Sequence, residues 1–160
     1  MKALSLTQPW ASLVAVGAKR YETRSWYTGH RGRIAIAAAK GFPGHCRELV
    51  STAPFAAALS GAGYRALADV MAECGSIVAV ATIVACVRVD GGLPRDLSGL
   101  PPPAEHEESF GDYTAGRFAW ALADVRRLTR PVPAKGALGL WLLPSDLERA
   151  VLDQLDEAAA

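Results

Sequence analysis

The feature that most constrains the fold is one apolar run in the middle of the sequence. Residues 76–89 are rich in Val, Ile and Ala and carry one charged side chain, Arg88. The run is shorter than the roughly 20 residues that a membrane-spanning helix needs, and its β-branched residues favour a strand. The sequence therefore predicts a long central strand over residues 76–89, against which other strands must pair.

Shorter strand and helix patterns lie on both sides of this run. Apolar or alternating patterns predict strands at residues 3–6, 21–26, 33–38, 117–128 and 140–143, with Pro131 and Pro133 ending the strand before them. Helices are predicted over residues 7–17 and 64–74 and from Ser145 onward. Thr7 is expected to cap the first helix, and Ser145 with Glu148 matches a capping box for the last.

These elements predict an α+β fold. Five or six short strands interrupted by a few helices are typical of a small β-barrel with flanking helices, formed here by one domain over residues 1–160. Within it, residues 41–75 consist of short Ala- and Leu-rich pieces separated by Gly and Pro, which indicates a helical insertion. Residues 90–110 contain two adjacent glycines and three consecutive prolines, which predicts a flexible Pro-rich loop.

The charge of the chain is unevenly distributed. The formal net charge is +1, yet residues 1–47 hold eight Lys or Arg residues and a single acidic residue, Glu22. A basic segment in a nearly neutral protein predicts a local positive field that suits a phosphate-bearing ligand. The sequence leaves open the alternative that these charges spread over several faces and form no patch.

Cysteine and histidine usage gives no pattern of a disulfide framework or a metal site. The three cysteines lack C-x-x-C spacing and the three histidines are scattered, so neither a metal nor another cofactor is expected. The first residues form too short an apolar stretch for a secretory signal, and no small-residue cleavage site follows. We therefore expect a cytoplasmic protein without membrane attachment, with a monomer favoured.

The residues that most suggest chemistry are three charged side chains near the N-terminus. Strand alternation places Glu22 and Arg24 on one face and Thr23 on the other, and Lys19 follows Gly17, which can end the preceding helix. If that helix folds back beside its strand, the three charges share a pocket near a helix N-terminus, which suits a phosphate or the polar edge of a base. The alternative is a structural Glu22–Arg24 pair with a solvated Lys19.

The order of these residues resembles a known family. The sequence Gln8-Pro9-Trp10-Ala11, then G-x-K-x-x-E-x-R over residues 17–24, then a basic strand ending in an Ile-Ala-Ala-like segment is similar to the ASCH domain family, a branch of the PUA-like superfamily. Residues 111–120 and 131–141 also resemble the G-x-[FY]-x-x-G-R-[FY]-x-W and P-x-x-x-K-G-x-x-G-[LI]-W segments of bacterial members. The resemblance covers most of the chain except residues 41–75 and the Pro-rich loop.

The resemblance implies a PUA-like barrel whose cleft carries Lys19, Glu22 and Arg24 and binds RNA. Some members look like ribonucleases, which would use Lys19 to stabilise phosphate charge and Glu22 or Tyr113 to transfer a proton. Another branch hydrolyses N4-acetylcytidine with a Lys, a Thr three residues later and a Glu from a distant strand. Here Glu22 stands at that Thr position and residues 77–89 contain no acid, so the match to this branch is incomplete.

We therefore expect a binding module for single-stranded RNA or a modified nucleoside. The alternatives are a hydrolase of the same fold, either a ribonuclease or an N4-acetylcytidine amidohydrolase, and a protein-interaction module that uses the Pro-rich loop as its contact. Incubation with single-stranded RNA and with N4-acetylcytidine separates the first two, since a binding module gives salt-sensitive binding without turnover.

Aromatic and basic residues extend the predicted site. Trp10 and Trp26 are candidates for stacking on an unpaired base, whereas Trp120 and Trp141 lie in apolar strands and are expected in the core. Basic residues at positions 117 and 135 either line the rim or are ordinary solvated charges. The predicted ligand-binding residues are Gln8, Pro9, Trp10, Lys19, Glu22, Arg24, Trp26, Tyr113, Arg117 and Lys135.

Overall fold

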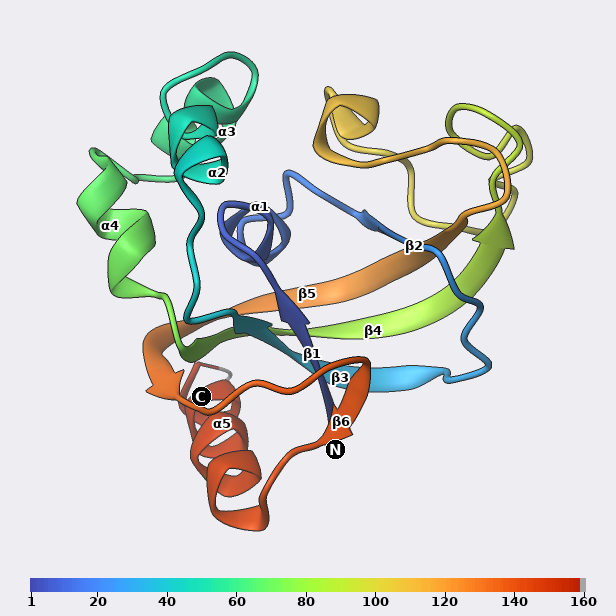
Figure 1. The fold of residues 1–160 in the computed structure, drawn as a ribbon. Helices are drawn as coiled ribbons and strands as arrows, with labels where there is room; N and C mark the ends of the chain where they lie inside the picture. The colour runs from blue at the N-terminus through green and yellow to red at the C-terminus, as the bar shows by residue number, and fades with distance from the viewer. Residues whose placement is uncertain (159–160) are drawn as a thin grey trace.

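A computed structural model describes residues 1–158 of the chain. Within these residues the strands are β1 (Lys2–Leu6), β2 (Tyr21–Arg24), β3 (Gly32–Ala38), β4 (Ser76–Arg88), β5 (Phe118–Pro133) and β6 (Leu140–Leu142). The α-helices are α1 (Trp10–Ala15), α2 (Gly44–Leu49), α3 (Phe55–Gly61), α4 (Leu67–Ala72) and α5 (Ser145–Glu157), and η1 (Glu107–Phe110) is a short 3-10 helix. Figure 1 shows their arrangement.

All of these strands belong to one mixed sheet with the order β2-β5-β4-β3-β1-β6. β1 and β3 are parallel and the other neighbours are antiparallel. The register between β4 and β5 shifts at several points; such bulges increase the local twist of a strand pair. The sheet therefore curls into a partly closed barrel around α1 (Figure 1), which confirms the predicted α+β barrel of five to six strands with flanking helices.

Helix α1 fills the hollow of this curled sheet. Its Ala11 and Val14 are fully buried in one apolar cluster with Ile34 and Ile36 of β3 and Trp120 of β5. Burial of such side chains contributes about 1.5–3 kcal/mol for each large aliphatic residue. The first helix is therefore part of the core, and its burial fixes the position of the short connections to β1 before it and to β2 after it.

β5 is longer than the sequence predicts. It continues through Pro131 to Pro133, whereas the prolines were expected to end the strand at Leu128. β2 pairs with β5 only as far as Ala121, so within residues 1–158 no strand pairs with this edge along the later part of β5. A proline is tolerated at such an edge because no ladder hydrogen bond is lost there.

The predicted helix caps are also wrong. Thr7 does not cap α1; instead the side-chain oxygen of Gln8 accepts hydrogen bonds from the backbone N–H and the hydroxyl of Ser12, at 3.0 and 2.9 Å. Ser145 lies inside the first turn of α5 and makes no side-chain cap bond. Glu148 contacts the amino group of residue 1. Gln8 thus takes the role at α1 that was expected of Thr7, and at α5 the Glu148 carboxylate binds the amino group of the chain instead of the start of its own helix.

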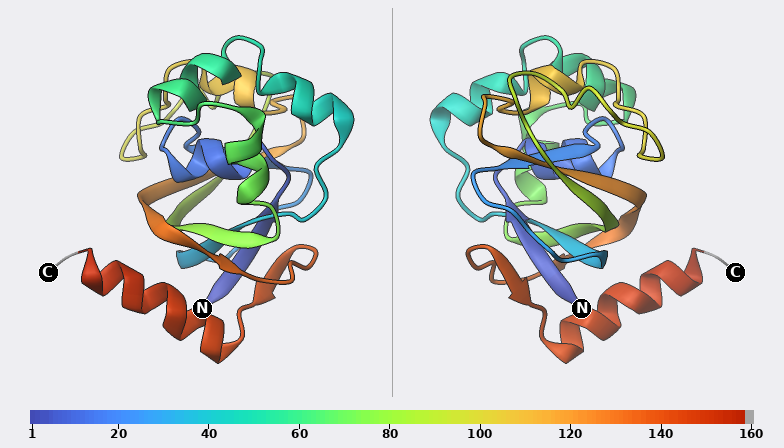
Figure 2. Two further views of the ribbon diagram at one scale, coloured as in Figure 1. Left: turned by 90° about the vertical axis from the view of Figure 1, so that its left-hand side faces the viewer. Right: turned by 90° about the vertical axis from the view of Figure 1, so that its right-hand side faces the viewer.

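Three helices, α2, α3 and α4, lie between residues 44 and 72 over one end of the barrel (Figures 1 and 2). A buried carboxylate, that of Glu73, fastens them to the sheet. It accepts hydrogen bonds from the hydroxyls of Ser12 and Tyr64 at 2.6 and 2.7 Å and contacts the guanidinium of Arg127 at 3.1 Å. Charge-assisted bonds of this kind are about twice as strong as neutral ones, so this segment is firmly anchored.

Helix α5 covers the opposite end of the barrel (Figure 2). Its Val151 and Leu155 are buried against Ile77 and Leu128, and the side chain of Gln154 exchanges hydrogen bonds with the backbone of residue 130 at 2.9 and 3.0 Å. Neither α5 nor any other helix in residues 1–158 combines the length and the apolar character that crossing a bilayer requires.

Candidate functional site

The turn between α1 and β2 positions Lys19. Gly17 adopts a left-handed backbone conformation, φ +76°, which ends the helix, and the backbone N–H of Lys19 then donates to the carbonyl of Leu13 at 3.1 Å. The side chain of Lys19 is only 1% exposed. Its Nζ donates to the carbonyl of Tyr21 at 2.6 Å and lies 3.7 Å from Glu22 Oε2. The alternative of a solvated Lys19 is therefore wrong.

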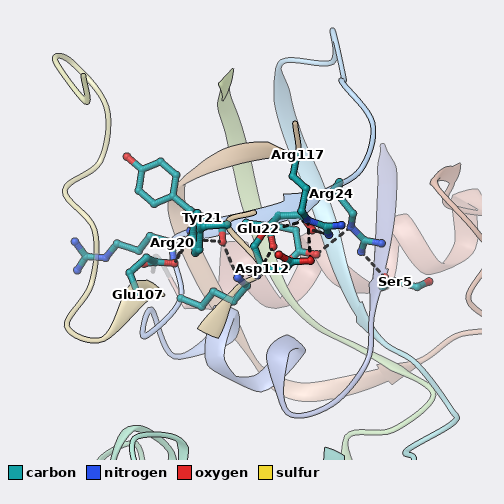
Figure 3. A network of polar contacts seen from close by, with 11 residues as sticks. Ser5, Arg20, Tyr21, Glu22, Arg24, Glu107, Asp112 and Arg117 are labelled. Carbon is teal, nitrogen blue, oxygen red and sulfur yellow. Dashed lines mark hydrogen bonds and ion pairs between the residues drawn. The ribbon is translucent and has the colours of Figure 1, made fainter. Parts of the chain in front are cut away.

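Glu22 and Arg24 project from the same face of β2, as strand alternation predicts. Arg24 Nε lies 2.9 Å from Glu22 Oε1, and Arg24 Nη2 donates to the carbonyl of Ser5 at 3.1 Å. Glu22 is 7% exposed, whereas about a quarter of the Arg24 side chain reaches solvent. Lys19, Glu22 and Arg24, here called the charge row, thus run from the interior to the surface. Figure 3 shows Glu22 and Arg24 of this row.

The surroundings of Lys19 change its acid–base behaviour. Burial lowers the pKa of its amine below the usual lysine range, because desolvation disfavours the ammonium form. The charges of Glu22 and Glu107 act in the opposite direction but do not cancel the effect. Lys19 is therefore closer to exchanging a proton near neutral pH than an ordinary surface lysine.

The charge row faces two adjoining cavities of about 340 and 290 Å³. Both cavities are lined by Trp10, Glu22 and Thr23; the first adds Lys19 and residues 109–112, and the second adds Arg24 and Arg117 among others. Each volume lies near the lower end of the range of about 300–1,000 Å³ for small-ligand sites. Together they form what we call the cleft, which has a size suited to a nucleoside or a nucleotide.

A second segment completes the cleft, and its key residue is Glu107. This carboxylate is 1% exposed and accepts hydrogen bonds from the backbone N–H groups of Arg20, Tyr21 and Ala104 at 2.9–3.1 Å. The hydroxyl of Tyr21 also donates to the carbonyl of Pro101 at 2.5 Å. These bonds fasten the Pro-rich segment to the start of β2, so that residues 109–112 form one wall of the cleft.

Thr23 and Asp112 join this wall to the strand. The hydroxyl of Thr23 accepts a hydrogen bond from the backbone N–H of Asp112 at 3.0 Å, and the Asp112 carboxylate lies 3.3 Å from Arg117 Nε. Alternation directs Thr23 away from Glu22, yet both residues line the two cavities. Arg117 borders the second cavity, as predicted for a rim residue.

Tyr113 lies behind the cleft. Its hydroxyl is 3.4 Å from the Tyr21 carbonyl and 3.5 Å from Glu107 Oε1, and it borders neither cavity. Burial, with the nearby charges of Glu107 and Glu22, raises the pKa of Tyr113 above the usual tyrosine range. The phenol therefore stays protonated at neutral pH, and the structure gives Tyr113 a supporting position.

The four tryptophans occupy different environments. Trp120 is fully buried, as the sequence predicts. Trp10 lines both cavities and packs edge-on against Phe55, with the ring centroids 6.2 Å apart. Trp26 lines the second cavity, is 37% exposed and packs edge-on against Trp120 at 4.6 Å. Trp141, expected in the core, is only partly buried at its edge. Two indoles thus border the cleft with surface left for a ligand.

Tyr113 was predicted to bind the ligand and does not line the cleft, and the same is true of three more predicted residues. Gln8 is fully buried, and its amide is occupied by Ser12, Glu73 and the backbone of residue 70. Pro9 is buried next to it at the start of α1. Lys135 is exposed and lines a different cavity. Sequence spacing placed these residues near the site, but their side chains are directed elsewhere by α1 and by the loop after β5.

The basic segment of residues 1–47 does not form one patch. Of its eight Lys and Arg residues, Lys19 and Arg24 line the cleft, whereas Arg20 and Lys40 line two other cavities. The alternative that these charges spread over several faces is therefore the correct one. The positive charge of the cleft comes instead from Lys19 and Arg24 together with the distant Arg117.

Comparison with known proteins places these features in a family. A model of the ASCH domain matches residues 4–131 of the chain. Activating signal cointegrator 1 from Homo sapiens is 31% identical over 151 residues, which cover 91% of this chain and 23% of that protein. The protein of the same name from Mus musculus is 30% identical over the same shares. The chain thus spans less than a quarter of the length of these relatives.

Solved structures agree on the fold. The crystal structure of ASCH from Zymomonas mobilis superposes with a TM-score of 0.51 at 17% identity, covering 95% of this chain and 93% of that chain. A point mutant of that protein gives a TM-score of 0.52 at 18% identity, with coverages of 95% and 96%. Because the family model extends over most of the sequence, the chain belongs to the ASCH domain family.

Proposed function

We propose that the cleft binds single-stranded RNA or a modified nucleoside. The observation that carries this proposal is that the charge row, with Lys19 and Glu22 buried, lines two adjoining cavities together with two tryptophans. Withdrawing an ammonium from water is costly, and a buried ion pair is weak as a purely stabilising device. The arrangement is better suited to a ligand that completes the hydrogen bonding of these groups.

The charge row matches the chemistry of a nucleotide. Lys19 and Arg24 offer donors for carbonyl or phosphate oxygens, and Glu22 offers an acceptor for an exocyclic amine. Trp10 and Trp26 offer faces on which an unpaired base can stack, worth about 1–3 kcal/mol for each base. Donor, acceptor and stacking surface within one cleft are the elements of single-stranded RNA recognition. RNA binding is also what the resemblance to the ASCH family implies.

A binding measurement with matched variants tests this proposal. Fluorescence anisotropy with a labelled single-stranded RNA compares the wild type with Lys19→Met and Arg24→Gln. The control is Arg149→Gln, which removes one charge from the exposed face of α5 at the other end of the barrel. Loss of one charge-assisted bond, about 1.5–3 kcal/mol, weakens binding roughly 10- to 150-fold in Arg24→Gln.

The control variant is expected to bind like the wild type. Circular dichroism of each variant shows whether it is folded, which matters most for Lys19→Met because this side chain is buried. The proposal is overturned if the wild type binds no RNA or nucleoside, or if folded Arg24→Gln and Lys19→Met bind as tightly as the wild type.

A hydrolase that uses the same cleft is the second candidate, favoured by the lowered pKa of Lys19 beside Glu22. In a ribonuclease reaction, the ribose 2′-oxygen attacks the adjacent phosphorus while Glu22 accepts its proton. The bond from phosphorus to the 5′-oxygen breaks, and Lys19 supplies the proton to that leaving oxygen. The products are a 2′,3′-cyclic phosphate and a 5′-hydroxyl.

Turnover assays distinguish the two candidates. Purified protein is incubated with single-stranded RNA and with N4-acetylcytidine, and cleavage or deacetylation is followed by chromatography. Turnover by the wild type that is lost in Lys19→Met supports the hydrolase. Binding without turnover supports the binding module.

A further inference from the structure

A third cavity shares one lining residue with the cleft and was not part of the site described above. It has a volume of about 920 Å³ and lies between the end of β3 and the segment that joins β5 to β6. Among its lining residues is Ser5, which also lines the cavity that contains Glu22 and Arg24. Within residues 1–158, Ser5 is the one residue that the linings of these two cavities share, and we call it the junction.

Three contacts define this junction. The backbone carbonyl of Ser5 accepts a hydrogen bond from Arg24 Nη2 at 3.1 Å on the side of the cleft (Figure 3). The hydroxyl of Ser5 accepts one from Trp141 Nε1 at 3.1 Å. A side chain at Gly136 would place its Cβ 2.6 Å from the same hydroxyl, so the loop after β5 packs directly on Ser5. Ser5 is thus held by Arg24 on the side of the cleft and by Trp141 and the loop after β5 on the side of the third cavity.

The side chains that line the third cavity are of the kinds that bind single-stranded nucleic acid. Lys40 and Lys135 both line it and both are exposed, whereas no acidic residue of the described part of the chain lines it. No ion pair within residues 1–158 involves either lysine. The other lining residues are mostly small or apolar, and they include Pro133 and Leu138. Leu138 is 98% exposed.

We propose that this cavity continues the cleft and binds the next nucleotides of a single-stranded RNA whose first nucleotide contacts the charge row. Lys40 and Lys135 pair with backbone phosphates, and the apolar wall accepts the face of a base. Arg24, which contacts both Glu22 and Ser5, lies at the passage from one part to the other. The inference rests on the proposed function and specifies its ligand as an oligonucleotide rather than a free nucleoside.

The test compares a short with a long ligand. The ligands are cytidine 5′-monophosphate and a single-stranded RNA of about eight nucleotides, within the range of site sizes for small nucleic-acid-binding barrels. The dissociation constant of each is measured at several salt concentrations for the wild type and the double variant Lys40→Gln/Lys135→Gln. The double variant Lys2→Gln/Arg149→Gln is the control, because it removes the same charge from exposed positions outside the cavity.

The proposal predicts a selective effect on the long ligand. Each lost phosphate contact on a single strand lowers the slope of log affinity against log salt by about 0.7, so two lost contacts lower it by about 1.4. When the salt concentration rises from 50 to 200 mM, the affinity of the double variant for the long ligand therefore falls about sevenfold less than that of the wild type. Affinity for the monophosphate is expected to stay unchanged, as is the affinity of the control for both ligands.

Failure of this inference can be told apart from failure of the proposed function. A double variant with the wild-type salt slope, together with monophosphate binding that depends on Lys19, overturns the extension and leaves the proposed function standing. The proposed continuation of the RNA site is also overturned if an acidic peptide binds through Lys40 and Lys135 and RNA does not bind there. Absence of any nucleotide or RNA binding overturns both.

Discussion

Substitution of Glu107 by glutamine tests how the Pro-rich segment is held against the cleft. The carboxylate is 1% exposed, and its two oxygens accept hydrogen bonds from three backbone N–H groups, at residues 20, 21 and 104. Glutamine has almost the same shape, but one oxygen becomes an NH₂ group that cannot accept. Glu107→Gln therefore isolates the effect of the charge and of one acceptor.

The expected loss of stability follows from these bonds. At least one buried N–H loses its acceptor, which costs about 1–3 kcal/mol, and the remaining bonds lose their ionic character, which costs about 1 kcal/mol more. We therefore expect the free energy of unfolding to fall by about 2–4 kcal/mol. The same change removes a negative charge that raises the pKa of Lys19, so that pKa should fall further.

Urea unfolding and NMR titration of the Lys19 side chain measure these two effects. Glu105→Gln is the matched control, since the Glu105 side chain is 89% exposed and its contact is with the exposed His106. A surface change of this kind is usually within about 0.5 kcal/mol of the wild type. If Glu107→Gln unfolds like Glu105→Gln and leaves the Lys19 titration unchanged, the Pro-rich segment is not held as described.

Three further substitutions probe other parts of the structure. Glu22→Gln is expected to keep the fold and to weaken RNA binding roughly tenfold, the effect of about 1.4 kcal/mol; a large drop in Tm at unchanged affinity would make its pair with Arg24 structural. Tyr113 has a raised pKa in the folded state, so its stability contribution is present below about pH 10 and is lost above it, by up to about 1.36 kcal/mol for each pH unit. In urea unfolding, the free energy of unfolding of Tyr113→Phe should fall less above pH 10 than that of the wild type. An equal fall would refute the raised pKa of Tyr113. Gly136→Ala places a methyl group 2.6 Å from the Ser5 hydroxyl, which should cost about 1–3 kcal/mol in thermal unfolding; an unchanged Tm would mean that the loop does not pack on Ser5.

Much of the fold follows from local sequence patterns, and the charge row is the part of the site that they predict best. β4 was predicted from its apolar run, and the shared face of Glu22 and Arg24 from strand alternation. Both depend on neighbours within a few residues, for which the backbone period is a reliable guide. The end of the α1 helix at Gly17 was predicted for the same reason.

The parts that were missed depend on contacts between distant residues. Glu107 meets the backbone of residue 21 across 86 positions in the sequence, and no local pattern distinguishes it from the acidic residues beside it. Gln8 was assigned to the ligand because of its place in a motif, but its side chain is used by Ser12 and Glu73 instead. Such roles are set by packing between elements, which spacing along the chain does not encode.

The most direct test of the proposed site is a crystal structure of the protein with bound cytidine 5′-monophosphate. We expect polar atoms of the nucleotide within hydrogen-bond distance of Lys19 Nζ and the Glu22 carboxylate, with the base against Trp10 or Trp26. A nucleotide bound on another face of the molecule, with the cleft between β2 and residues 109–112 free of ligand, would contradict the proposed site.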